Sequence, residues 1–155
     1  MCSSDLGSRG MAGGQAIDLD AVGKSLNQAE LEFMHAHKTG AIIRAAVALG
    51  ARCSGGRRLS AEELEELDAY AKHVGLAFQV IDDVLDCVTP TATLGKTAGK
   101  DAANNKPTYV SLLGLEPARA LALELRDRGV AHLARFGAGG RRLRELADFV
   151  VERKF

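Results

Sequence analysis

The sequence predicts an all-α fold, and its composition supports this prediction in two ways. Alanine and leucine are abundant, whereas aromatic residues make up only 5% of the 155 residues and tryptophan is absent. A β-sandwich needs more β-branched and aromatic residues than this, and helices packed on helices do not. Hydrophobic residues at 46% and charged residues at 26% are typical of a folded chain. We therefore expect one helical domain.

The first half of the chain contains clear signals for helix starts. Residues 1–10 are polar, rich in serine and glycine and aperiodic, so we expect a disordered or unrelated tail before a domain over residues 11–155. A short helix is expected over residues 11–22. The capping-box pattern from Asn27 to Glu30 then predicts a helix that continues to about residue 49.

A second capping-box pattern, from Ser60 to Glu63, predicts a long helix to about residue 86. Residues 89–106 contain proline, glycines and an Asn-Asn pair with little periodicity, and such a long loop is usually functional. Pro107 suits the first turn of a short helix to about residue 113. Two further helices are expected, over residues 116–136 and 141–154.

Net charge and hydropathy argue against a nucleic-acid partner and a membrane span. Lysine plus arginine total 20 and aspartate plus glutamate total 20, which argues against a general nucleic-acid partner. The longest apolar run, residues 41–51, is interrupted by Arg44, so we expect no membrane span. Residues 1–10 lack the apolar core of a signal peptide, and we predict a cytoplasmic protein.

Acidic residues stand in an unexpected place on the helix predicted from residue 60. On a helical wheel, Asp82 falls inside the apolar stripe, Gln79 and Asp86 fall on its flank, and Asp83 lies at its border. Burying an unpaired carboxylate costs several kcal/mol. We therefore expect a cation there, and clustered carboxylates suit Mg²⁺. The alternative is a solvated helix end with ordinary surface aspartates.

Positive charges accompany these carboxylates. Lys38 falls in the middle of the apolar stripe of its helix, where it must snorkel, pair with a carboxylate or bind an anion. A simple salt bridge to an aspartate of the next helix is the alternative. Lys96, Lys100 and Lys106 lie on the glycine-containing loop that follows the aspartates. Together these residues have the chemistry of a magnesium–diphosphate site.

Five short motifs follow one another along the chain. Residues 13–19 (GGQAIDL) and 37–40 (HKTG) precede the aspartates of residues 78–86 (FQVIDDVLD), and residues 94–101 (LGKTAGKD) and 105–109 (NKPTY) follow. In this order the motifs resemble the trans-isoprenyl diphosphate synthase (polyprenyl synthetase) family, most closely bacterial farnesyl/geranyl diphosphate synthases, and residues 78–86 resemble its second aspartate-rich motif. The resemblance implies the isoprenoid synthase fold of antiparallel helices around a deep cavity, usually as a homodimer.

The resemblance also implies a reaction and residue roles. In this family an allylic diphosphate ionises with the help of Mg²⁺ and condenses with isopentenyl diphosphate. The implied catalytic residues are Lys38, Asp82 and Lys96. The implied substrate-binding residues are Lys38, Thr39, Gln79, Lys96 and Lys106, and the implied metal ligands are Asp82, Asp83 and Asp86. Arg153-Lys154 resembles the basic tail that meets isopentenyl diphosphate in some members.

The sequence departs from the family pattern in one large respect. A complete synthase of this type is about twice as long and carries another Asp-Asp-x-x-Asp motif with an Arg-Arg pair in its first half. The only Asp-Asp pair here is Asp82-Asp83. We therefore expect the C-terminal half of a synthase, inactive in isolation and with exposed apolar faces.

Two other functions stay open at this point. One is a non-catalytic helical partner subunit of a prenyl synthase, which the short length favours. The other is a terpene cyclase, which shares the helical fold and the ionisation chemistry. Magnesium-dependent diphosphate binding would separate the partner subunit from the synthase, and the loop lysines with Lys38-Thr39 resemble the elongating synthases rather than the cyclases.

Overall fold

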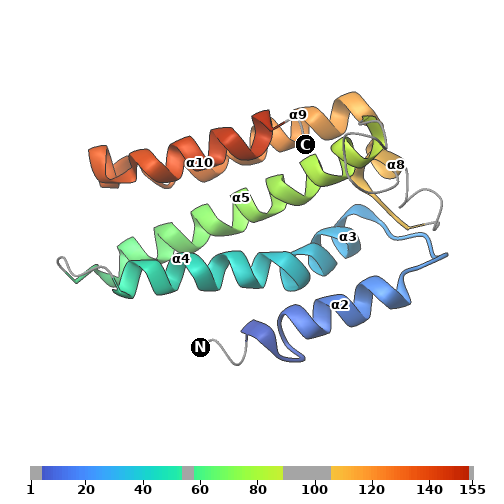
Figure 1. Ribbon diagram of the computed structural model, residues 1–155, viewed down its shortest axis with the longest axis horizontal. Coiled ribbons are helices and arrows are strands. Elements are labelled where there is room, and N and C mark those ends of the chain that lie inside the picture. Colours follow the sequence, from blue (N-terminus) through green and yellow to red (C-terminus); the bar gives the residue numbers. More distant parts are fainter. Residues whose placement is uncertain (1–4, 54–57, 89–105, 154–155) are drawn as a thin grey trace.

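A computed structural model describes residues 5–53, 58–88 and 106–153. The elements in these ranges are all helical, which confirms the predicted all-α class (Figure 1). They are α2 (Met11–Asp20), α3 (Gln28–His35), the π-helical segment η1 (Ala36–Gly40), α4 (Ala41–Cys53), α5 (Ala61–Val88), α8 (Tyr109–Leu113), α9 (Leu115–Ala131), the 3₁₀ segment η2 (Ala134–Gly140) and α10 (Arg141–Glu152). The predicted loop lies outside the described residues as far as residue 105.

The predicted capping boxes are present at both long helices. The Asn27 side chain accepts the Glu30 N–H at 3.0 Å, and the Glu30 carboxylate accepts the Asn27 N–H at 2.8 Å. Ser60 and Glu63 make the same reciprocal pair at 3.2 and 2.9 Å. These bonds satisfy backbone donors that have no partner inside the helix, which is why the two helices start where the sequence predicts.

Several helix boundaries differ from the predicted ones. The helix predicted to end near residue 49 continues to Cys53. The first helix ends at Asp20 rather than residue 22. Pro107 precedes the short helix α8 instead of lying in its first turn, because Thr108 is the N-cap residue. The helix predicted to reach residue 136 ends at Ala131, and a 3₁₀ segment follows in which Gly137 has a φ of 50°. Glycine adopts this conformation without the strain that other residues would meet.

The helices form an antiparallel stack with α5 in its middle. Successive long helices run in opposite directions, from α2 through α3–α4, α5 and α9 to α10 (Figure 1). α5 packs against α4 on one side and against α9 and α10 on the other, while α2 packs against η1. Short connections favour such antiparallel neighbours.

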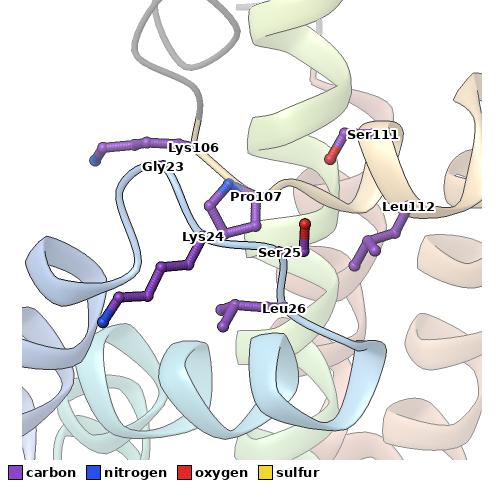
Figure 2. A pocket seen from close by; sticks show the side chains of 8 residues that line it. All are labelled: Gly23, Lys24, Ser25, Leu26, Lys106, Pro107, Ser111 and Leu112. Atoms are coloured by element: carbon purple, nitrogen blue, oxygen red, sulfur yellow. The ribbon is translucent and has the colours of Figure 1, made fainter.

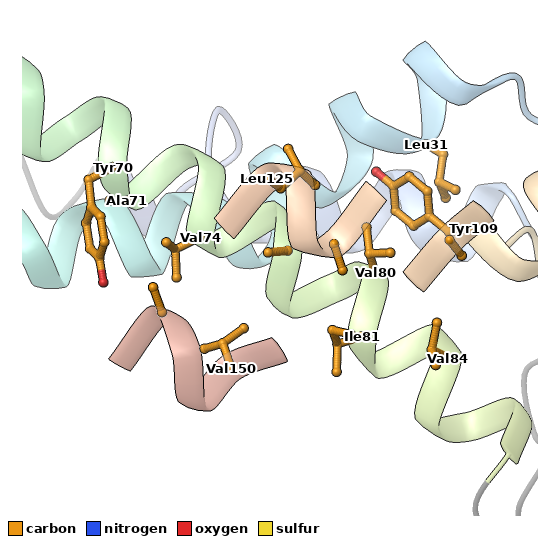
Figure 3. Close-up of a cluster of buried hydrophobic side chains, with 14 of the residues drawn as sticks. Leu31, Tyr70, Ala71, Val74, Val80, Ile81, Val84, Tyr109, Leu125 and Val150 are labelled. Carbon is orange, nitrogen blue, oxygen red and sulfur yellow. The ribbon is translucent and has the colours of Figure 1, made fainter. Parts of the chain in front are cut away.

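The hydrophobic core lies along α5 (Figure 3). Tyr70, Ala71, Val74, Val80 and Val84 all come from this helix and are buried. The Tyr70 hydroxyl donates a hydrogen bond to the carbonyl of Leu143 at 2.6 Å, which ties α5 to α10. Buried residues thus occur on several sides of α5, because other helices pack around it. Few positions on α5 are therefore left to contact a ligand.

The segment before α2 is described from residue 5. The Gly10 N–H donates to the Gly7 carbonyl at 3.0 Å, and the Gly13 N–H donates to the same carbonyl at 3.3 Å. Residues 1–4 lie outside the described part of the chain, and the predicted tail over residues 1–10 stays a prediction. None of the described helices has the length and apolar character needed to cross a membrane.

Candidate functional site

Side chains from several helices meet in a pocket of about 130 Å³ beside the C-terminal part of α5. Five of the predicted site residues line it: Lys38, Gln79, Asp82, Asp83 and Lys106. The other lining residues are Asp18, Met34, His35, Pro107 and Thr108.

The remaining predicted site residues are not brought to this pocket by the described structure. Thr39 lies on η1 next to Lys38 but is not among the lining residues, and Asp86 is buried with 6% of its surface exposed. Lys96, together with Lys100, lies outside the described residues. The predicted roles of these residues stay predictions.

Asp18 of α2 joins the two described lysines of the pocket. Its Oδ2 accepts a hydrogen bond from Lys38 Nζ at 2.7 Å and one from Lys106 Nζ at 3.3 Å. Burial raises the pKa of Asp18, but the two lysines lower it by more, so that it lies below the usual value of 3.8. Asp18 is therefore ionised at neutral pH, and two ammonium groups share one carboxylate.

A close helix contact places Asp18 next to Lys38. A Cβ atom on Gly14 of α2 would clash with the backbone nitrogen of Lys38 and lie 2.5 Å from its Cα. Only glycine lets α2 approach η1 this closely. Lys38 itself lies on a single π-helical turn, a distortion found frequently at functional sites. The residues 13–19 and 37–40 thus form one unit around the Lys38–Asp18 ion pair.

Asp82 is more exposed than its position on the helical wheel predicts. Its side chain is 49% exposed and its Oδ1 pairs with Arg153 Nη2 at 2.6 Å. The prediction that Asp82 lies inside the apolar stripe is wrong, because α5 turns a different face to its neighbours near its C-terminal end. In that part of α5, the buried apolar side chains are those of Val80, Ile81 and Val84. Gln79 is buried as expected, with 8% exposed.

Asp83 connects α5 to the segment that carries Lys106. Its Oδ2 accepts the backbone N–H of Tyr109 at 2.7 Å. Tyr109 opens α8, so this bond fixes the preceding residues 106–108 against the pocket. Asp83 therefore has a structural role here in addition to presenting a carboxylate to the pocket.

His35 gives the pocket a neutral, buried wall. The ring stacks on that of Tyr109 with 5.7 Å between centroids, and the side chain of Gln79 lies beside it without the geometry of a full hydrogen bond. Burial lowers the pKa of His35 to about 4, with Lys38 contributing in the same direction. The imidazole is therefore uncharged at neutral pH.

A larger and more open pocket of about 550 Å³ adjoins the first one (Figure 2). It shares Lys106 and Pro107 with the first pocket and adds Lys24, Ser25 and Ser111. Lys24 is paired with Asp20 at 2.7 Å, and the Ser111 hydroxyl donates to the Thr108 carbonyl at 2.8 Å. Carboxylates of α5 do not line it, so we place the candidate site in the smaller pocket.

The pocket offers two carboxylates to a metal ion. Asp82 and Asp83 both line it, and their oxygens are the donors that Mg²⁺ prefers. Within residues 5–53, 58–88 and 106–153, no three His, Cys, Asp or Glu side chains are grouped as the ligands of a metal ion would be. The predicted magnesium site therefore stays a prediction, with Asp82 and Asp83 as its candidate ligands in this pocket.

Two ionisable side chains of the pocket, Asp18 and His35, were not among the predicted site residues. Asp18 lies inside the motif 13–19, and the adjacent glycines were a signal that this segment approaches another backbone closely. His35 falls near the apolar stripe that also contains Lys38. A helical wheel shows both positions on their own helices, but it does not show that two helices present them to one pocket.

The fold, the five motifs and the composition of this pocket agree with one family, and the sequence comparison identifies it. The polyprenyl synthetase family model matches residues 7–132. This chain therefore belongs to the polyprenyl synthetase family.

Individual relatives agree with this assignment. The chain is 50% identical over 156 residues to farnesyl diphosphate synthase of Escherichia coli, covering 97% of this chain and 51% of the relative. A polyprenyl synthase structure from Caulobacter crescentus, complexed with calcium and isoprenyl diphosphate, is 30% identical with a TM-score of 0.86. The match covers 96% of this chain and 57% of the Caulobacter crescentus chain. A geranyltransferase structure from Helicobacter pylori, complexed with magnesium and isoprenyl diphosphate, is 32% identical with a TM-score of 0.79, covering 96% and 48%. The chain spans about half the length of these relatives.

Proposed function

We propose that this chain carries the allylic-diphosphate half of a prenyltransferase site. In the proposed reaction an allylic diphosphate condenses with isopentenyl diphosphate, as in geranyl or farnesyl diphosphate synthesis. The observation that carries the proposal is the convergence of Lys38 and Lys106 on one buried carboxylate, in the pocket that also holds Asp82 and Asp83. Two ammonium groups that share one aspartate have charge left for an anion.

The lysines suit the chemistry of ionisation. When the allylic C–O bond breaks, its electron pair leaves with pyrophosphate and negative charge grows on the leaving oxygens. Ammonium groups held in place beforehand stabilise this charge without reorganising during the reaction. Lys38 and Lys106 are held by Asp18 in this way, and Lys96 is proposed to add a third ammonium group.

Mg²⁺ fits the same pocket as a proposed cofactor. Asp82 and Asp83 would hold it, and Asp86 is proposed as a further ligand in keeping with the family resemblance. When bound, Mg²⁺ would supply positive charge that stabilises the negative charge of the diphosphate. Gln79 and the neutral His35 line the same pocket, and Gln79 is proposed to lie near the allylic chain. Thr39, next to Lys38, is proposed to bind the diphosphate.

The proposal is tested by calorimetric titration with a non-hydrolysable allylic diphosphate analogue and Mg²⁺. Asp82→Ala should abolish magnesium-dependent binding. Asp68→Ala is a matched control on the same helix, because Asp68 is 46% exposed and also pairs with an arginine, Arg44, at 2.7 Å. Equal effects of the two substitutions would contradict the assignment. A folded chain without magnesium-dependent binding would favour the non-catalytic partner subunit.

Homodimer formation and a cytoplasmic location are further proposals. Several large apolar side chains are exposed, among them Leu19 at 64%, Phe33 at 55% and Phe149 at 65%, and such surfaces favour association. Light scattering of the purified chain measures the oligomeric state. A monomer at micromolar concentration would contradict the dimer for this chain.

A further inference from the structure

Arg153 reaches from the end of α10 to α5 and makes three contacts there. Its Nη2 donates to Asp82 Oδ1 at 2.6 Å and to the carbonyl of Phe78 at 3.1 Å. Its Cζ lies 3.9 Å from the centroid of the Phe78 ring, which adds a cation–π contact. The guanidinium of Arg153 is therefore held by the Asp82 carboxylate and by both the carbonyl and the ring of Phe78.

The backbone directs this side chain toward α5. Arg153 leaves the helical conformation with a ψ of 146°, while its N–H still donates to the Phe149 carbonyl at 3.0 Å. The side chain is only 13% exposed, although arginine loses much rotamer freedom when it is ordered. An ordered arginine in this position indicates a specific contact rather than a loose surface pair.

Arg153 approaches Asp82 from outside the candidate site. It does not line the pocket that contains Lys38, Asp82 and Lys106. Instead it lines a neighbouring pocket of about 270 Å³, together with Ile81, Val84 and Val151. The ion pair uses Oδ1 of Asp82, and Oδ2 takes no part in it. Asp82 therefore pairs with Arg153 and also lines the candidate site, which Arg153 does not.

We propose that Arg153 is a positioning residue for Asp82. By holding Oδ1, it fixes the carboxylate so that the other oxygen is presented to a divalent cation in the site. This inference rests on the proposed function, because it assigns a supporting partner to a proposed metal ligand. Residues that hydrogen-bond to a metal ligand fix its orientation, and their loss typically weakens metal binding tenfold to a hundredfold.

The test measures how tightly the 155-residue chain binds Mn²⁺ in the presence of inorganic pyrophosphate. Binding is monitored by electron paramagnetic resonance, because the signal of free Mn²⁺ is lost when the ion binds. Arg153→Gln should weaken Mn²⁺ binding roughly tenfold. Arg153→Lys keeps the charge and should recover most of the affinity. Arg142→Gln is the matched control, since Arg142 is on α10 and pairs with the exposed Glu145 at 2.7 Å, away from Asp82. It makes the same change in net charge and should stay within about twofold of the unmodified chain.

Circular dichroism melting curves establish that each variant is folded at the temperature of the measurement. A merely structural role of Arg153 would lower the melting temperature without changing the Mn²⁺ affinity of the folded chain. Equal affinities of the Arg153→Gln and Arg142→Gln variants would overturn the inference and leave the proposed function standing. Tighter binding by Arg153→Gln would overturn it as well, since Arg153 would then be a competitor of the metal. Absence of pyrophosphate-dependent Mn²⁺ binding in the unmodified chain would instead overturn the proposed function, and this inference with it.

Discussion

Replacing Asp18 with asparagine removes the negative charge that Lys38 and Lys106 share, while almost preserving the shape of the side chain. Breaking a fully buried ion pair costs about 3–5 kcal/mol, and an exposed pair contributes about 0–1 kcal/mol. The side chain of Asp18 is 9% exposed, and those of Lys38 and Lys106 are 30% and 26% exposed. This pair lies between the two limits. We therefore expect Asp18→Asn to lower the free energy of unfolding by about 2 kcal/mol.

Urea unfolding followed by far-ultraviolet circular dichroism measures this loss. Asp20→Asn is the matched control, because Asp20 is on the same helix and forms an exposed ion pair with Lys24. The side chain of Asp20 is 80% exposed and that of Lys24 is 58% exposed. The control should change the unfolding free energy by less than about 0.5 kcal/mol. Equal losses in the two variants would refute the argument that burial makes Asp18 the structural centre of the site.

Two further changes probe the packing and the protonation of the site. Gly14→Ala forces a Cβ atom against the Lys38 backbone and should destabilise the chain by at least about 2 kcal/mol. Gly50→Ala, at an exposed position of α4 with open space around it, should stabilise the chain by up to about 1 kcal/mol. Urea unfolding measures both variants, and changes of the same sign in their free energies of unfolding would contradict this account. Lowering the pH from 7 to 5 should reduce the unfolding free energy by about 2 kcal/mol through His35, because the unfolded imidazole takes up a proton near pH 6.5 and the folded one only near its pKa of about 4. The stabilities of the unmodified chain and of His35→Gln at the two pH values test this, and an unchanged pH dependence in the variant would refute it.

The helices and their starts could be predicted from the sequence because their signals are local. The capping boxes at Asn27 and Ser60 act within four residues, and hydrophobic periodicity needs only the helix itself. The π-helical turn at residues 36–40 could not be predicted in this way. It depends on the approach of α2 at Gly14, which the local sequence of η1 does not contain.

The helical wheel singled out charged residues that line the candidate pocket, but it predicted their surroundings less well. Lys38 on the apolar stripe indicated a carboxylate or anion partner. The alternative of a salt bridge to the following helix is not what the structure shows, since Asp18 comes from the preceding one. For Asp82 the wheel assumed one buried stripe along the whole of α5, whereas α8, α9 and α10 cover different faces of it. Tertiary neighbours decide such positions, and a single helix carries no information about them.

We propose that the pocket between Lys38, Lys106 and the α5 carboxylates binds an allylic diphosphate together with Mg²⁺. Calorimetric titration of the unmodified chain with a non-hydrolysable allylic diphosphate analogue, with and without Mg²⁺, tests it most directly. We predict saturable binding that depends on Mg²⁺ and approaches one ligand per chain. A folded chain that binds no analogue in either condition, or binds it equally with and without Mg²⁺, would contradict the claim.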